Sequence, residues 1–86
     1  MPEISRFFGM VIAMYFDDHP PPHFHVTYGG ERARVRIDPP GLLSGSLSPR
    51  ALALVIEWAV LRHNELMTNW ERLQAQEPAM KIEPLR

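Results

Sequence analysis

The sequence contains no cysteine among its 86 residues. Disulfide bonds and thiolate metal ligands are therefore excluded, and any metal site would have to use histidine and carboxylate side chains. The chain also has little net charge, with a formal value of −1 at pH 7. Overall charge therefore predicts no nucleic-acid partner, and only a local patch of positive charge could attract one.

Long hydrophobic runs are absent as well. The stretch Met10–Phe16 is apolar but too short to span a bilayer, so we expect no membrane segment. The run lacks the basic flank and the small-residue cleavage site of a secretory signal peptide. We therefore expect the protein to be cytoplasmic. We find no internal repeat, no phosphate-cradling loop and no Ser/His/Asp order typical of a nucleophilic enzyme.

The residues that are present predict one small α+β domain over 1–86. Apolar residues make up 45% and charged residues 22%, as in ordinary soluble domains. The patterns predict an antiparallel sheet of three to four strands with one long C-terminal helix packed on one face. The predicted strands cover 7–16, 23–28 and 32–38, with a candidate fourth over 42–47; the helix covers 49–76 and a tail covers 77–86. A core this small often needs a metal, a second copy of the chain or a partner protein for stability.

Glycine, serine and proline mark the expected connections. Gly9 lies inside the predicted first strand, where glycine indicates a bulge or a close backbone approach. Gly29-Gly30 is a strong signal for a hairpin between the second and third strands. Ser48-Pro49 provides a capping hydroxyl and a proline at the first helical position, which is typical of a helix start.

Three of the four histidines fall within seven residues, on both sides of a proline run. His19 precedes Pro20–Pro22, and His23 and His25 follow it. The prolines fix φ and make this arm stiff and extended. Residues two apart on a strand share a face, so His23 and His25 should point the same way. Core packing does not require this clustering, and we look for function here first.

One interpretation is a site for a divalent metal ion. The candidate ligands are His19, His23 and His25 together with Asp17 or Asp18. Zinc, nickel and iron(II) accept imidazole and carboxylate ligands. Against this stands the simpler interpretation that the histidines are hydrogen-bonded residues of a polar strand face. Arginines on the next strand also disfavour a nearby cation.

A second interpretation starts from those arginines. Arg32, Arg34 and Arg36 alternate along one strand face. A two-residue loop at Gly29-Gly30 would pair His25 with Arg34 and His23 with Arg36, whereas a four-residue loop would pair His25 with Arg36. Either loop places the arginines on the face that carries the histidines.

Such a stripe suits an RNA or DNA backbone, because guanidinium groups bind phosphate through paired hydrogen bonds. His23 and His25 could then act as general acid and base, and an arginine could stabilise the transition state. This predicts a ribonuclease that needs neither metal nor other cofactor. The simpler interpretation is that the arginines form the solvated face of an edge hairpin.

A third interpretation is a protein-interaction module without catalysis. Leu54, Trp58 and Leu61 would form an apolar helix face, and such patches often bind partners. Alternatively, Trp58 folds against the tail, in which Ile82 and Leu85 could dock, and closes the core. For His63, which lies in the apolar stripe of the helix, we expect an ordinary core position.

Several short motifs together resemble a known family. They are Met-Pro-x-Ile-x-Arg-Phe at the start, Asp-x-x-Pro-Pro-His-Phe-His-Val over 18–26, Glu57-Trp58-Ala59, Glu65-Leu66, Asn69-Trp70 and the final Ile82-Glu83-Pro84-Leu85. The chain resembles the small bacterial family of domain of unknown function 4160 over nearly its whole length. In that family pattern a histidine stands four residues after the helical tryptophan; here Arg62 takes that position and the histidine follows at His63.

The resemblance implies a prokaryotic cytoplasmic protein with no settled activity. It also implies a small partner protein encoded by a neighbouring gene, in the manner of toxin–antitoxin pairs. Combined with the arginine stripe, we expect a component of such a module that binds or cleaves RNA. A histidine-rich metal-binding protein is the alternative.

Overall fold

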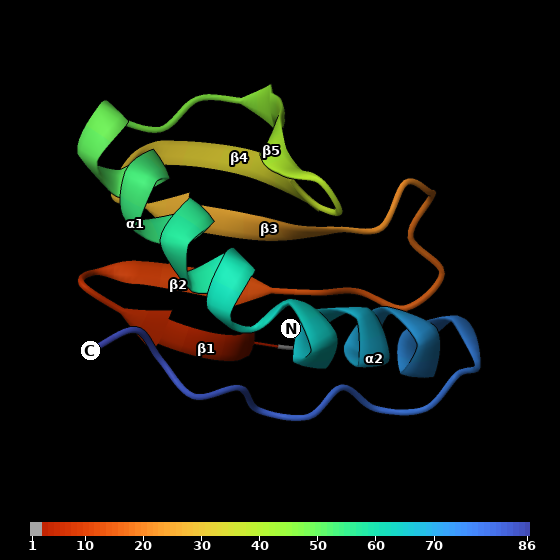
Figure 1. The fold of residues 1–86 in the computed structure, drawn as a ribbon. Helices are drawn as coiled ribbons and strands as arrows, with labels where there is room; N and C mark the ends of the chain where they lie inside the picture. Colours follow the sequence, from red (N-terminus) through yellow and green to blue (C-terminus); the bar gives the residue numbers. More distant parts are fainter. Residues whose placement is uncertain (1–2) are drawn as a thin grey trace.

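The computed structural model describes residues 3–86; Met1 and Pro2, which open the first family motif, lie outside them. The predicted α+β class and antiparallel sheet are confirmed, with five strands in the order β1-β2-β3-β4-β5 (Figure 1). The strands are β1 (Glu3–Phe7), β2 (Met10–Ala13), β3 (His23–Tyr28), β4 (Glu31–Ile37) and β5 (Pro40–Gly45). The helices are α1 (Pro49–Leu61) and α2 (His63–Gln74).

The prediction of one long first strand over 7–16 is wrong, because the chain reverses at Phe8 and Gly9. Both residues have positive φ, 50° and 80°, as a two-residue hairpin turn of the primed type requires. The residues before this turn, to which no strand was assigned ahead of Phe7, therefore form strand β1, which pairs with β2 and places Ile4 in the core. This hairpin raises the strand count above the three or four predicted, and the predicted strand 42–47 begins earlier, as β5.

The single predicted helix over 49–76 is two helices. It begins as expected, with the Ser48 hydroxyl accepting a hydrogen bond from the Ala51 amide and Pro49 in the first turn. At Arg62 the backbone leaves helical geometry, with φ −109° and ψ 23°. The chain changes direction there, so α1 crosses one face of the sheet while α2 continues beside the loop that joins β2 to β3 (Figure 1).

The core lies between the sheet and α1, and the tail closes it. Trp58 is fully buried, with its ring 5.7 Å from that of Phe24 on β3. The Trp58 indole donates a hydrogen bond of 2.8 Å to the carbonyl of Glu83. Ile82 and Leu85 are buried, which confirms that the tail docks. The expectation of an exposed face including Trp58 is thereby wrong.

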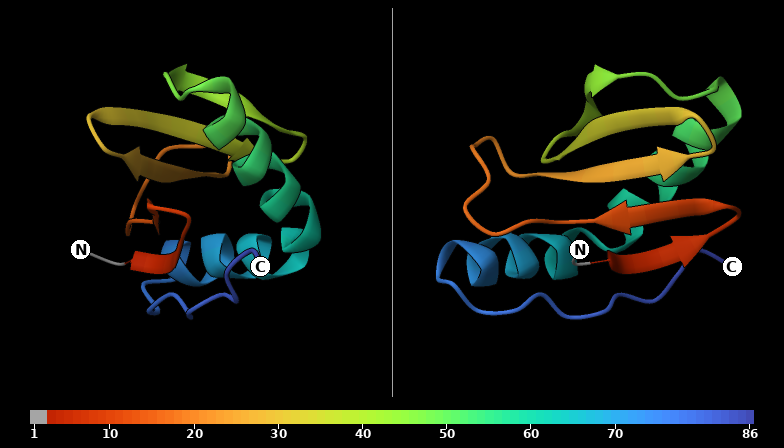
Figure 2. Two further views of the ribbon diagram at one scale, coloured as in Figure 1. Left: turned by 90° about the vertical axis from the view of Figure 1, so that its left-hand side faces the viewer. Right: turned by 180° about the vertical axis from the view of Figure 1, so that it is seen from behind.

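The opposite face of the sheet has no helix across its middle, as the right-hand view of Figure 2 shows. His25 and Thr27 of β3 are partly exposed there, beside the exposed Arg32 and Arg34 of β4. Among residues 3–86 no helix combines the length and the apolar character needed to cross a membrane. The open face therefore carries candidate functional residues that the sequence indicated, among them His25, Arg32 and Arg34.

Candidate metal centre

The register between β3 and β4 is the one predicted for a two-residue loop at Gly29-Gly30. His23 lies opposite Arg36, and His25 lies opposite Arg34. Since cross-strand neighbours project to the same side, the histidines and arginines share one face of the sheet.

Sharing a face does not bring the two groups together. The Arg34 Nε donates to the Ser44 hydroxyl on β5 at 2.7 Å, and the Arg36 Nε donates to the carbonyl of Pro39 at 3.0 Å. His25 instead hydrogen-bonds to Asp18 and packs edge-on against Tyr15, with ring centroids 4.7 Å apart. The arginines thus bond toward β5 and the histidines toward the loop before β3. The expected repulsion between arginine and a cation at the histidines is weakened accordingly.

Asp18, His23 and His25 form one compact cluster. The Asp18 Oδ2 lies 2.9 Å from the His25 Nε2 and 3.1 Å from the His23 Nε2. One ligand atom from each residue lies within 4.8 Å of the other two. An ion with bonds of about 2.0–2.2 Å could reach all three after small side-chain shifts.

The chemistry of this cluster turns on the tautomer of His23. Its Nδ1 lies 2.8 Å from the carbonyl of Pro21, and a carbonyl can only accept, so Nδ1 carries the proton. When the ring is neutral, Nε2 presents a lone pair. Although the Asp18 carboxylate is 3.1 Å away, Nε2 makes no contact with hydrogen-bond geometry, and the residue is only 2% exposed. A buried lone pair facing a carboxylate is unfavourable unless a proton or a metal ion lies between them.

Asp18 is held in its charged form. Partial burial raises the pKa of its carboxyl, but a hydrogen bond from His25, the electrostatic interaction with His23 and a hydrogen bond from the His19 amide outweigh burial. The pKa of Asp18 consequently lies below its ordinary value. A carboxylate that is ionised near neutral pH is ready to bind a metal without first losing a proton.

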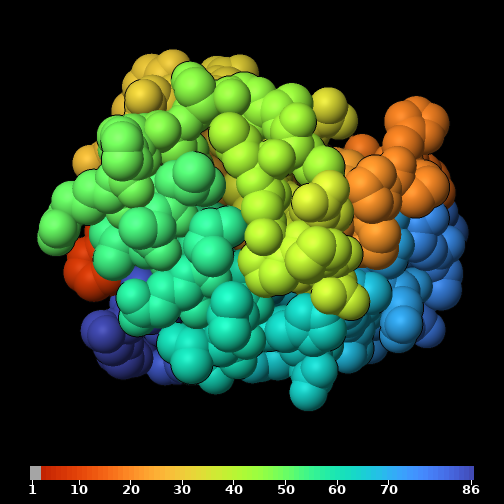
Figure 3. Space-filling view, turned by 45° about the horizontal axis from the view of Figure 1, so that its top comes forward, coloured from red at the N-terminus to blue at the C-terminus, as the bar shows by residue number. Residues whose placement is uncertain are grey.

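Helix α2 supports the cluster from behind. The Trp70 ring lies 5.5 Å from that of His23, and the Gln74 amide donates to the backbone carbonyl of Asp18 at 3.1 Å. Gln76, just past the helix, donates to the Asp17 side chain. The loop and the end of α2 are neighbours on the surface in Figure 3. This support could not be predicted from local sequence patterns, because Gln74 and Asp18 are 56 positions apart.

Two of the five predicted ligands are not in the cluster. The exposed His19 contributes only its backbone amide, and the Asp17 carboxylate is turned to Gln76. His63 is not the core residue that was expected: it is partly exposed, with its Nε2 3.7 Å from the Asp38 carboxylate. Tyr15, which touches His25, was missed because it lay inside an ordinary apolar run.

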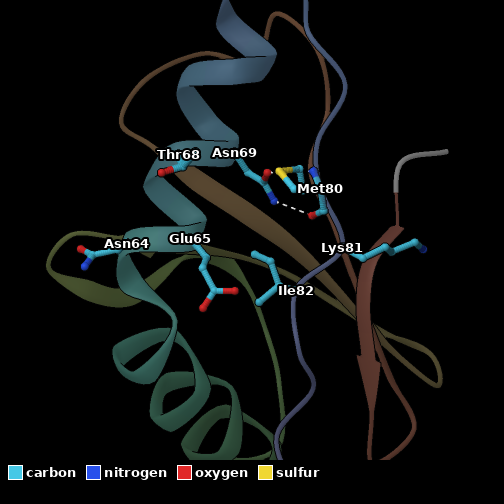
Figure 4. A pocket seen from close by; sticks show the side chains of 7 residues that line it. All are labelled: Asn64, Glu65, Thr68, Asn69, Met80, Lys81 and Ile82. Atoms are coloured by element: carbon cyan, nitrogen blue, oxygen red, sulfur yellow. Dashed lines mark hydrogen bonds between the residues drawn. The ribbon is translucent and has the colours of Figure 1, made fainter.

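A hollow of about 390 Å³ on the open face adjoins the cluster and shares His25 with it. The hollow is lined by residues of β1, β2, β3 and β4 and by Tyr15, which follows β2. The lining residues are Glu3, Arg6, Val11, Tyr15, His25, Val26, Thr27 and Arg32. A separate pocket of about 220 Å³ lies between α2 and the tail (Figure 4). There Asn69 donates to the carbonyl of Met80 and accepts from its amide, so its buried side chain serves to fix the tail.

The fold and the cluster define a small α+β domain with two imidazoles and one carboxylate at the edge of an open sheet face. A family model described as "Domain of unknown function (DUF4160)" matches residues 9–71. The chain belongs to this family, as the sequence motifs indicated. The match includes Asp18, His23 and His25 and ends before Gln74. No curated protein and no solved structure matches the chain.

Proposed function

We propose that this domain binds one divalent transition-metal ion through Asp18 Oδ2, His23 Nε2 and His25 Nε2. The observation that carries the proposal is the Nε2 of His23, which is buried, lies 3.1 Å from the Asp18 carboxylate and makes no hydrogen bond. Of the two main interpretations of the sequence, the metal site is the one that the geometry favours.

The ligand set suggests which ion and what kind of site. Two imidazoles and a carboxylate suit zinc, nickel or iron(II), whereas calcium and magnesium prefer oxygen ligands. Closed structural zinc sites have four protein ligands, while sites that bind or transform a ligand keep a position open. With three protein ligands, this site belongs to the second kind.

The test is metal analysis of protein purified without chelators, followed by calorimetric titration of the metal-free protein with zinc, nickel and iron(II). We expect one ion per chain for at least one of the three metals. The Asp18→Asn variant keeps the size of the side chain but loses its charge, and it should bind much more weakly. Absence of stoichiometric binding by all three ions would reject the proposal.

RNA binding is a second candidate, supported by the arginines themselves. Within the chain from Glu3 onward, Arg32, Arg34 and Arg36 form no ion pair with an acidic side chain. Three uncompensated guanidinium groups on one strand favour a polyanion. Cleavage without metal would use His23 and His25 as acid and base, although the burial of His23 makes that role unfavourable.

The RNA candidate is tested by the salt dependence of binding to a single-stranded RNA. Arg34→Ala with Arg36→Ala should weaken binding at low salt and flatten its dependence on salt. Arg50→Ala, at an exposed position of α1 away from this face, is the control. Equal binding by the double variant and the control would exclude the arginine face.

A partner and a compartment complete the proposal. We infer a cytoplasmic protein that pairs with the product of a neighbouring gene. Val60 and Leu61, 59% and 63% exposed where α1 ends, are apolar surface that a partner could cover. Co-expression with the neighbouring gene product should yield a complex on size-exclusion chromatography. If the chain alone elutes as a homo-oligomer, a second copy could cover this surface and no separate partner would be needed.

A further inference from the structure

We propose that the hollow beside the metal centre binds a phosphate monoester as its dianion, with one phosphate oxygen on the metal and another on Arg32. This inference rests on the proposed metal site and adds the class of ligand.

The open side of the metal site faces the hollow. The His23 side chain is 2% exposed, whereas those of His25 and Asp18 are 29% and 20% exposed. His25 belongs to both the cluster and the lining of the hollow. Because three protein ligands leave a coordination position vacant, a ligand atom can reach the ion from the hollow past His25 and Asp18.

The fixed charges select a dianion. Glu3 and Arg6 at the hollow are paired at 2.8 Å and neutralise each other. The ion would contribute two positive charges, Asp18 removes one, and Arg32 adds one, so the ion and the lining together would present two positive charges. Arg34, opposite His25, donates to Ser44 on β5 and is not part of the lining. A phosphate monoester carries close to two negative charges at neutral pH, because its second pKa is about 6. A carboxylate or a phosphodiester carries only one.

The walls suit an organic group on that phosphate. Tyr15 packs edge-on against His25, and Val11 provides apolar surface beside it. The volume of about 390 Å³ lies within the range of roughly 300–1,000 Å³ of small-molecule sites. Thr27, opposite Arg32 in the ladder, adds a hydroxyl near the expected phosphate. The hollow therefore fits an aromatic or sugar phosphate better than a bare inorganic anion.

The test uses cobalt(II), whose visible spectrum reports its coordination, and phenyl phosphate as the probe. Cobalt is first titrated into the metal-free protein, and phenyl phosphate is then added to the loaded protein. We expect a change in the cobalt bands and binding at least ten times tighter than that of inorganic phosphate or benzenesulfonate. Arg32→Gln should weaken phenyl phosphate binding at least tenfold, whereas Arg50→Gln should not change it.

Each outcome has one meaning. If cobalt does not bind, the proposed metal site fails. If cobalt binds and phenyl phosphate leaves its spectrum unchanged, the metal site stands and the ligand inference fails. Equal binding by Arg32→Gln and the parent protein would place the ligand elsewhere. If inorganic phosphate binds as tightly as phenyl phosphate, the apolar walls do not contribute to binding, and the inference of an ester ligand fails.

Discussion

At the scale of single residues, His23 carries the argument. Strand pairing places it opposite Arg36, the Pro21 carbonyl fixes its tautomer, and Trp70 covers it. Metal-binding histidines are commonly oriented in this way, with the second ring nitrogen donating to a backbone carbonyl. Burial then keeps water away from Nε2.

Two histidine substitutions test this assignment as a matched pair. His23→Gln removes the Nε2 ligand, and we expect the affinity for zinc to fall by at least ~100-fold, beyond the effect of losing an outer-shell group. His19→Gln, four positions earlier on an exposed side chain, should leave the affinity unchanged. Calorimetric titration of both variants measures this. If both variants lose zinc affinity to a comparable degree, the cluster is not the binding site.

A second residue-scale prediction concerns the last residue of β5. Gly45 has φ 79°, and a Cβ added there would collide with the backbone carbonyl of Arg32. Gly45→Ala should therefore lower the free energy of unfolding by at least ~2 kcal/mol, since both the strain and the clash act on the folded state. Gly30→Ala, with open space around it, should change it by less than ~1 kcal/mol. Urea unfolding measures the free energy of unfolding of both variants. Equal losses in the two would contradict the backbone conformation of Gly45 in β5.

At the scale of elements, the sequence predicted what depends on local pattern. Alternation over 23–28 and 32–38, with two glycines between them, predicted the β3–β4 hairpin and the face that the histidines and arginines share. It left the register open between a two-residue and a four-residue loop, and the structure has the pairing of the two-residue loop. The turn at Phe8-Gly9 was missed because it requires a positive φ at phenylalanine, which composition does not indicate. The break at Arg62 was missed because the apolar stripe continues through it into α2.

The cluster was predictable in part for the same reason. That His23 and His25 share a face follows from the period of a strand. The choice of Asp18 over Asp17 depends on a loop in which Asp17 has φ 58° and is held by Gln76. Contacts across more than fifty positions cannot be inferred from local spacing.

Those distant contacts give a prediction about helix α2. Gln74→Ala removes the hydrogen bond to the Asp18 carbonyl, and Gln76→Ala removes the one to Asp17. Because both bonds hold the loop that carries a metal ligand, the double variant should bind zinc roughly 10-fold more weakly, in line with outer-shell substitutions. Glu71→Ala, exposed on the same helix, is the control. Calorimetry that shows no difference from the control would indicate that the loop holds its shape unaided.

At the scale of the whole molecule, the proposed ion adds a further connection between the loop before β3 and the sheet. The loop is tied to the sheet through His25, through the His23 bond to the Pro21 carbonyl and through the Ile37 amide, which donates to the Pro22 carbonyl. It is tied to α2 through exposed hydrogen bonds of Gln74 and Gln76. Exposed hydrogen bonds contribute little to stability, since water competes for the same groups. An ion bound by Asp18, His23 and His25 would join the loop to β3 far more firmly.

This coupling predicts that zinc stabilises the fold. At a concentration one hundred times Kd, binding to the folded state alone adds about 2.7 kcal/mol to the free energy of unfolding. For a domain of this size that corresponds to a rise in Tm of roughly 10–20 °C. Calorimetric melting with and without zinc measures the rise, and Asp18→Asn should reduce it to almost nothing. A rise of equal size in that variant would mean that zinc stabilises the protein at another site and that the cluster does not hold the ion.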